Sequence, residues 1–138
     1  MRFVPFALLT LAAVALAACQ AAPQADVSNA GVVVELRDYS VKPNVPSVTA
    51  GKTKIGVRNA ASMTHELVVL KTDVSADKLP VDGAVAKAKE EGKVGFTDVM
   101  GAGQVRALTL DLSPGNYVLL CNVAGHYQLG MHVAFKVD

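Results

Sequence analysis

Near its C-terminus the chain reads YVLLCNVAGHYQLGMHVAFKV over residues 117–137. The two apolar ends of this stretch have the composition and alternation of β-strands, and the loop between them carries a thiol, an imidazole and a thioether. Four residues separate Cys121 from His126, and four more separate His126 from Met131. Glycines just before His126 and Met131 allow the loop to turn back on itself. We therefore expect these three side chains to lie together at one end of a β-sheet.

The side chains of this loop form a set of soft and borderline metal ligands. Thiolate and thioether select Cu(I) and imidazole also suits Cu(II), so the set predicts a copper site. A second imidazole must come from elsewhere in the chain, and His65 is the candidate because it stands where a loop becomes a strand. Taken singly, a buried cysteine or methionine is usually a core residue. The occurrence of all three groups within eleven residues, 121–131, favours a metal site.

Residues 1–18 have the pattern of a secretory signal peptide, with Arg2 as their only charge and an apolar run too short to span a membrane. The stretch LAAC at 16–19 resembles the bacterial lipobox, which predicts that Cys19 becomes the lipid-modified first residue of the mature chain. Cleavage at an A-x-A site is the alternative and would leave Cys19 as a free thiol. The expected location is periplasmic or otherwise extracytoplasmic, with a lipid anchor in a bacterial membrane.

The cysteine count agrees with export. Acylation of Cys19 leaves Cys121 as the one free thiol in an oxidising compartment, where a metal would hold it as a protected thiolate. A disulfide between the two would require that lipidation fail. Residues 19–31 comprise the acylated cysteine and a small, polar segment that predicts a flexible tether.

The charge of the chain gives little further guidance. Of 13 basic and 12 acidic residues, only Arg2 lies in the leader, so the mature chain is formally neutral. A neutral chain without a basic patch argues against nucleic acid as a partner.

Residues 32–138 predict one all-β domain. Short stretches alternate apolar and polar residues and are separated by turn signals such as SPGN at 113–116, which indicates a sandwich of seven or eight strands. The one departure is 72–93, where Asp82 can cap a short helix over 83–91 that Gly92 ends. This helix would form a single crossover.

Several motifs of this domain resemble those of one protein family. They are VP at 45–46, AGK at 50–52, VRN at 57–59, HEL at 65–67, SPGNY at 113–117 and the loop 121–131. Together they resemble the cupredoxins, the small blue copper proteins, over about residues 32–138, and the loop spacing is most like that of rusticyanin, sulfocyanin and auracyanin. The resemblance implies a Greek-key β-sandwich that binds one copper ion near one end. It also implies His65, Cys121 and His126 as strong ligands and Met131 as the weak axial ligand.

The chain departs from the family pattern beside the ligands. Many relatives have Asn after the first histidine, whereas Glu66 follows His65 here and Asn122 follows Cys121. Glu66 either forms a hydrogen bond to the ligand loop or is a solvated strand residue. His132 falls on the outward side of its strand, where a solvated or supporting role is expected. Met63 and Met100 are expected to pack, with substitution for the axial ligand as the alternative.

Taken together, these features favour a mononuclear type 1 copper protein that carries single electrons and is not an enzyme. The alternative is a copper chaperone or storage protein that delivers copper to an oxidase or reductase, which a flexible loop and an exposed Met131 would favour. A zinc hydrolase is disfavoured because four protein ligands leave no open position. The expected partners of this monomer are redox proteins, such as a cytochrome, an oxidase or a reductase, and the membrane.

Overall fold

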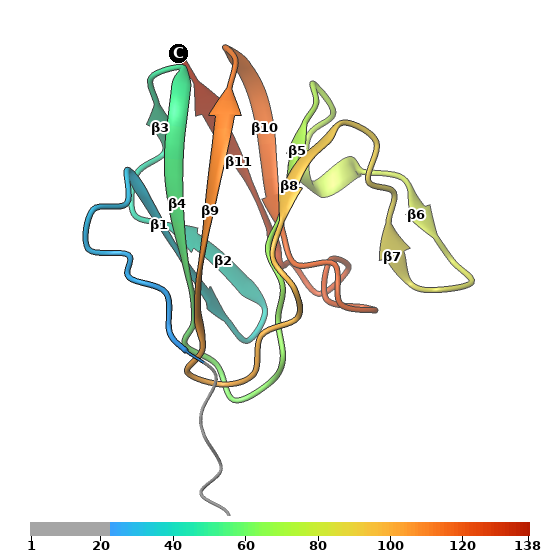
Figure 1. Cartoon of the computed structure of the whole chain (residues 1–138). Helices are drawn as coiled ribbons and strands as arrows, with labels where there is room; N and C mark the ends of the chain where they lie inside the picture. Colours follow the sequence, from blue (N-terminus) through green and yellow to red (C-terminus); the bar gives the residue numbers. More distant parts are fainter. Residues whose placement is uncertain (1–22) are drawn as a thin grey trace, which may run out of the picture.

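The computed structural model describes residues 23–138, which form two β-sheets packed face to face (Figure 1). The first sheet has the order β2-β1-β4-β9 and the second the order β3-β11-β10-β5-β8. The strands of the first sheet are β1 (Val32–Arg37), β2 (Ser40–Pro43), β4 (Gly51–Asn59) and β9 (Val105–Leu112). The strands of the second are β3 (Ser47–Val48), β5 (Val68–Lys71), β8 (Lys93–Phe96), β10 (Gly115–Leu120) and β11 (His132–Val137).

The pairing of strands is antiparallel except at two places. β1 runs parallel to β4, and β3 runs parallel to β11. The chain therefore crosses between the sheets instead of meandering through one of them. The prediction of an all-β Greek-key sandwich is confirmed, with nine strands in the two sheets instead of seven or eight.

The core lies between the sheets and follows from the period-two alternation of the strands. In β1 the inward residues Val32, Val34 and Leu36 are fully buried, and Leu119 in β10 faces them from the second sheet. Burying each such side chain stabilises the fold by about 1.5–3 kcal/mol. The same cluster contains Cys121 and Met131, so the site residues are built into the end of the core.

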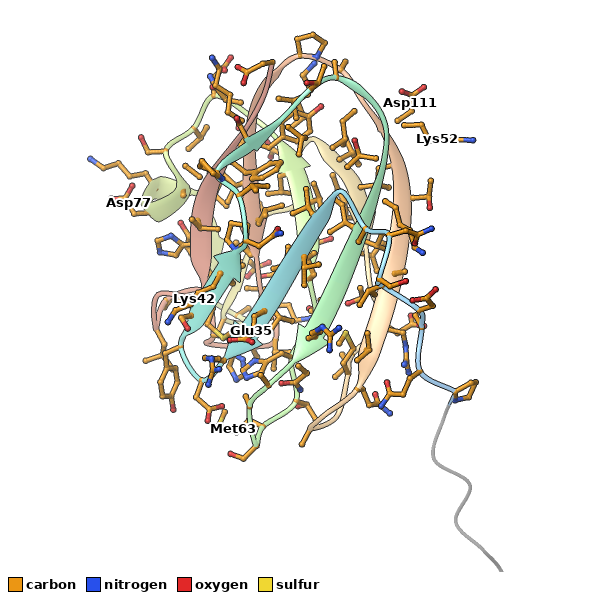
Figure 2. All side chains as sticks on the ribbon, turned by 90° about the vertical axis from the view of Figure 1, so that its left-hand side faces the viewer. Glu35, Lys42, Lys52, Met63, Asp77 and Asp111 are labelled. Atoms are coloured by element: carbon orange, nitrogen blue, oxygen red, sulfur yellow. The ribbon has the colours of Figure 1, made fainter. Side chains whose placement is uncertain are left out.

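The solvent face of the first sheet carries charges of both signs. Glu35 of β1 lies opposite Lys42 of β2, and Lys52 of β4 lies opposite Asp111 of β9. Opposite charges at facing positions favour this register. Figure 2 shows that Lys52 and Asp111 lie at one end of the sandwich and Met63 at the other.

Residues 24–31 lie against the first sheet and correct the prediction of a flexible tether up to residue 31. The side chain of Gln24 donates to the Gly103 carbonyl (3.1 Å) and accepts from the Val105 N–H (2.5 Å). Val27 is buried against Gly56, where an added Cβ would lie 2.7 Å from the Cβ of Val27. Only glycine at 56 leaves room for this N-terminal strap, residues 24–31. The predicted signal peptide 1–18 and the lipidation of Cys19 lie outside the described residues.

The predicted helix over 83–91 is wrong. The segment between β5 and β8 contains a single 3₁₀ turn, Ala76–Lys78, and a two-stranded ribbon of β6 (Val81–Asp82) and β7 (Lys87–Ala88). The Asp82 carboxylate accepts the N–H of Ala84 (2.9 Å), which makes a local turn instead of a helix cap. Ala86 then adopts a φ of 53°, which reverses the chain into β7. Figure 1 shows the ribbon beside the loop that follows β10.

Candidate metal centre

Two segments far apart in sequence bring three ligand-type side chains together. Cys121 and His126 lie on the loop after β10, and His65 precedes β5, where it pairs through its backbone with Met100. Asn59 fixes the loop before His65, because its buried amide donates to the carbonyls of Met63 (2.8 Å) and Met100 (2.9 Å). The side chain at 65 is thereby held at the end of the core.

The three donor atoms form a small triangle. His65 Nδ1 lies 3.1 Å from His126 Nδ1, and Cys121 Sγ lies 3.6 Å from the first nitrogen and 3.5 Å from the second. A metal about 2.0 Å from each nitrogen and 2.3 Å from the sulfur, with angles between tetrahedral and trigonal, requires N···N of about 3.3–3.5 Å and N···S of about 3.5–3.7 Å. These residues could therefore hold a metal ion with little movement.

Burial controls the ionisation of this group. It raises the pKa of the Cys121 thiol, although the N–H groups of Glu66 and Val123 point at the sulfur and act in the opposite direction. Burial also lowers the pKa of His126, and the neighbouring His65 lowers it further. His126 is thus kept in the neutral form that binds metals, and a cation at the sulfur would favour the thiolate.

Met131 is fully buried at the end of the same loop, and its backbone closes the loop on itself. The Met131 carbonyl accepts the N–H of Cys121 (3.0 Å), and its N–H donates to the His126 carbonyl (3.1 Å). The other two candidate methionines differ from each other. Met100 is buried in the core beside His65, whereas Met63 is 39% exposed.

A carboxylate without any distinguishing sequence signal lies behind His65. Asp38, in the turn between β1 and β2, has its Oδ1 3.3 Å from His65 Nε2. It precedes His65 by 27 residues and stands in an ordinary polar turn, so nothing in the sequence marks it.

The ligand loop is fastened to the segment between β5 and β8. Asn122 accepts the N–H of Ala88 (2.8 Å) and donates to the Ala88 carbonyl (2.9 Å) and to Glu90 (2.8 Å). The Tyr127 hydroxyl donates to the Ala76 carbonyl (2.9 Å) and accepts the N–H of Leu79 (2.8 Å). From the sequence alone Asn122 is only a departure from the family pattern. The supporting role of Tyr127 is not predicted from the sequence, although a buried tyrosine hydroxyl generally needs a hydrogen-bond partner.

Two other predictions concerned neighbours of the site. The backbone of Glu66 contacts the ligand loop, since its N–H points at Cys121 Sγ at 3.5 Å, while burial raises the pKa of its carboxyl group. His132 is half-buried and packs its ring against Tyr127, with centroids 4.9 Å apart. His132 therefore supports the ring that anchors the loop.

Comparison with known proteins agrees with this geometry. The model of the sulfocyanin (SoxE) domain matches residues 40–138. A search of curated proteins gave no significant match. Reduced auracyanin from the photosynthetic bacterium Roseiflexus castenholzii superposes with a TM-score of 0.57 at 18% identity over 77% of this chain and 94% of its own. Auracyanin B gives 0.58 at 20% identity over 78% and 87%, and reduced rusticyanin gives 0.53 at 17% identity over 78% and 77%. At these identities the similarity to solved structures shows the fold.

A Greek-key sandwich with two imidazoles and a thiol gathered at one end defines a cupredoxin. The match to the family model covers most of the domain, and the chain belongs to the sulfocyanin family within the cupredoxins. Its cofactor is copper, for which the donor set of nitrogen and sulfur is suited.

Proposed function

We propose that the protein is a one-electron carrier with a single type 1 copper site. His65, Cys121 and His126 are the strong ligands and Met131 is the weak axial ligand. The observation that carries the assignment is the triangle of donor atoms, with sides of 3.1, 3.5 and 3.6 Å, at the end of a packed core. When bound, copper supplies the Cu(I)/Cu(II) couple, which stores one electron without a substrate pocket.

Rigidity of the ligand loop supports electron transfer. A site that changes little between oxidation states needs ligands held by packing and by further hydrogen bonds. Asn122 and Tyr127 tie the loop to neighbouring segments, and the N–H of Gly125 donates to the Ala86 carbonyl (2.7 Å). These contacts fix the positions of Cys121 and His126 from both sides of the loop.

The route for the electron runs through His126. Cys121 and His65 are fully buried, whereas His126 retains 7% exposure. It lies on the loop that presents Leu129, which is 57% exposed, and the exposed Ala124. We place the docking surface for a redox partner on this apolar part of the loop, because a redox partner can approach the metal there through one imidazole.

Copper delivery is the weaker alternative. A delivery protein has to release its ion to a partner, which requires an accessible axial ligand or a mobile loop. Met131 is fully buried and the loop is tied by hydrogen bonds at Asn122, Gly125 and Tyr127. This arrangement favours retention of the metal.

Export and a lipid at Cys19 remain part of the proposal. Among residues 23–138, no helix is long and apolar enough to cross a membrane. The five steps from Cys19 to Gln24 span at most about 18 Å. Gln24 is bound to Gly103, whose N–H donates to the Asn59 carbonyl beside the His65 loop. A lipid anchor would therefore keep the copper end near the membrane surface, within reach of redox proteins such as a cytochrome, an oxidase or a reductase.

The test is a visible and electron paramagnetic resonance spectrum of the chain from residue 20 onward, loaded with one equivalent of Cu(II). A strong thiolate band with narrowed copper hyperfine splitting, bleached reversibly by a mild reductant, supports the carrier. Cys121→Ser should abolish the band, while Met63→Leu, at an exposed methionine, should leave it unchanged. A colourless protein that holds Cu(I) tightly would refute the carrier and favour copper delivery.

A separate experiment tests the anchor. Full-length protein should partition with membranes, and Cys19→Ala should release it or block its maturation. Equal maturation together with equal membrane association of the two would refute lipidation without bearing on the copper site.

A further inference from the structure

The turn between β1 and β2 reaches the copper end of the sandwich. Tyr39 in this turn has a φ of 64°, a left-handed conformation that is uncommon for a residue other than glycine. A Cβ placed on Gly130 would lie 3.8 Å from the Tyr39 carbonyl oxygen, so the turn lies against the ligand loop. The strained turn places Asp38 behind His65.

The two nitrogens of His65 face different partners. Nδ1 faces His126 and Cys121, and Nε2 lies 3.3 Å from the Oδ1 atom of Asp38. Since Nδ1 must be unprotonated to bind a metal, Nε2 carries the proton and donates it to the carboxylate. The other carboxylate oxygen of Asp38 accepts the hydroxyl of Ser62 at 3.5 Å. Ser62, in the loop that leads to His65, therefore helps to orient the Asp38 carboxylate.

We propose that Asp38 is a positioning residue that fixes the tautomer of His65 and lowers the reduction potential of the site. This inference rests on the proposed copper ligation by His65. Many metal-binding histidines donate their second N–H to a carboxylate, which orients the ring and makes the ligand more basic. Asp38 is such a partner for His65. It lies in the turn between β1 and β2, whereas Cys121 and His126 lie on the loop after β10.

The direction of the effect follows from charge. The metal together with a thiolate carries one more positive charge in the oxidised state than in the reduced state. A carboxylate behind His65 therefore stabilises the oxidised state, and its removal favours reduction. Because the Asp38 side chain is 39% exposed, solvent screens part of this interaction. We expect the ratio of Cu(II) to Cu(I) affinity to fall about tenfold in Asp38→Asn, which raises the potential by about 59 mV.

The experiment compares the reduction potentials of copper-loaded wild type, Asp38→Asn and Asp111→Asn by spectroelectrochemical titration. Asp111 is an exposed aspartate at the opposite end of the sandwich, so its variant removes the same charge far from the site (Figure 2). Asp38→Asn should raise the potential and Asp111→Asn should leave it unchanged. Asp38→Glu, which keeps the charge, should return the potential toward that of wild type. Equal shifts in the two asparagine variants, or a fall in Asp38→Asn, would overturn the inference.

A second readout does not depend on copper redox chemistry. In the zinc-loaded protein, ¹⁵N nuclear magnetic resonance should show His65 with its proton on Nε2 and slow exchange of that proton with solvent. Asp38→Asn should accelerate the exchange, and an unchanged rate would overturn the positioning role. If wild type fails to form a type 1 copper site, the proposed function fails, but this measurement still decides whether Asp38 holds His65.

Discussion

Replacement of Asn122 by alanine should destabilise the protein more than its position in a loop would indicate. The side chain is 1% exposed and makes three hydrogen bonds, two of which satisfy both backbone groups of Ala88. Alanine would leave the Ala88 N–H and carbonyl buried without a partner. Each buried unsatisfied group costs about 1–3 kcal/mol. We expect the free energy of unfolding to fall by about 3 kcal/mol, since partial entry of water offsets some of the loss.

The assay is urea unfolding of the metal-free protein, followed by circular dichroism, because bound metal would add its own binding energy to the stability. Asn116→Ala is the matched control. Asn116 is exposed, and its amide donates to Asp73 at 2.8 Å, so its loss should cost about 1 kcal/mol or less. An Asn122→Ala variant no less stable than this control would refute the argument that the Asn122 amide is needed to satisfy the buried backbone groups of Ala88.

Three further predictions concern the axial residue, an acidic group and the N-terminal strap. Met131→Leu should retain copper and raise the potential by on the order of 60 mV, measured by titration, because the oxidised state loses a weak donor. Burial raises the pKa of Glu90, but hydrogen bonds from Lys93 and from the Asn122 amide lower it overall. Its contribution to stability should therefore be fully present above the ordinary glutamate pKa and be lost as the pH falls through the lowered pKa of the folded state. The stability of Glu90→Gln, measured by urea titration, should approach that of wild type over the same acidic range. Gly56→Ala should cost about 1–3 kcal/mol in the same assay because its Cβ would lie 2.7 Å from a buried valine, whereas Gly83→Ala, where a Cβ meets nothing within 4 Å, should cost little.

The sequence was most informative where one residue type has one dominant use. The alternation of Val32, Val34 and Leu36 predicts a strand with one buried face, and β1 has that face. The spacing of Cys121, His126 and the distant His65 predicts a ligand set, and the structure brings the three together. In both cases the tertiary structure uses the residues in the way that the local sequence pattern predicts: the alternating apolar residues fill the core, and the metal-binding residue types lie together.

The failures occurred where the partner is remote. The side chain of Gln24 forms hydrogen bonds with Gly103 and Val105, which lie 79 and 81 positions further along the chain. A short segment of small and polar residues has no periodicity that would predict such bonds. Asp82 can cap a helix or close a turn, and the buried amide of Asn122 decides the outcome, because it uses the N–H and carbonyl of Ala88 that a helix would need. Asp38 has no local signal because its role depends entirely on the position of His65.

These remote contacts show that residues outside the ligand motif hold the copper site in place. Asn122 and Tyr127 both attach the ligand loop to residues 76–90, whereas Glu66, the neighbour of His65, contacts Cys121 Sγ through its backbone N–H. The rigidity of the loop therefore depends on a segment that contributes no ligand and has little regular structure. It follows that changes in the length of the segment between β5 and β8 should alter the site even when all four proposed ligand residues are kept.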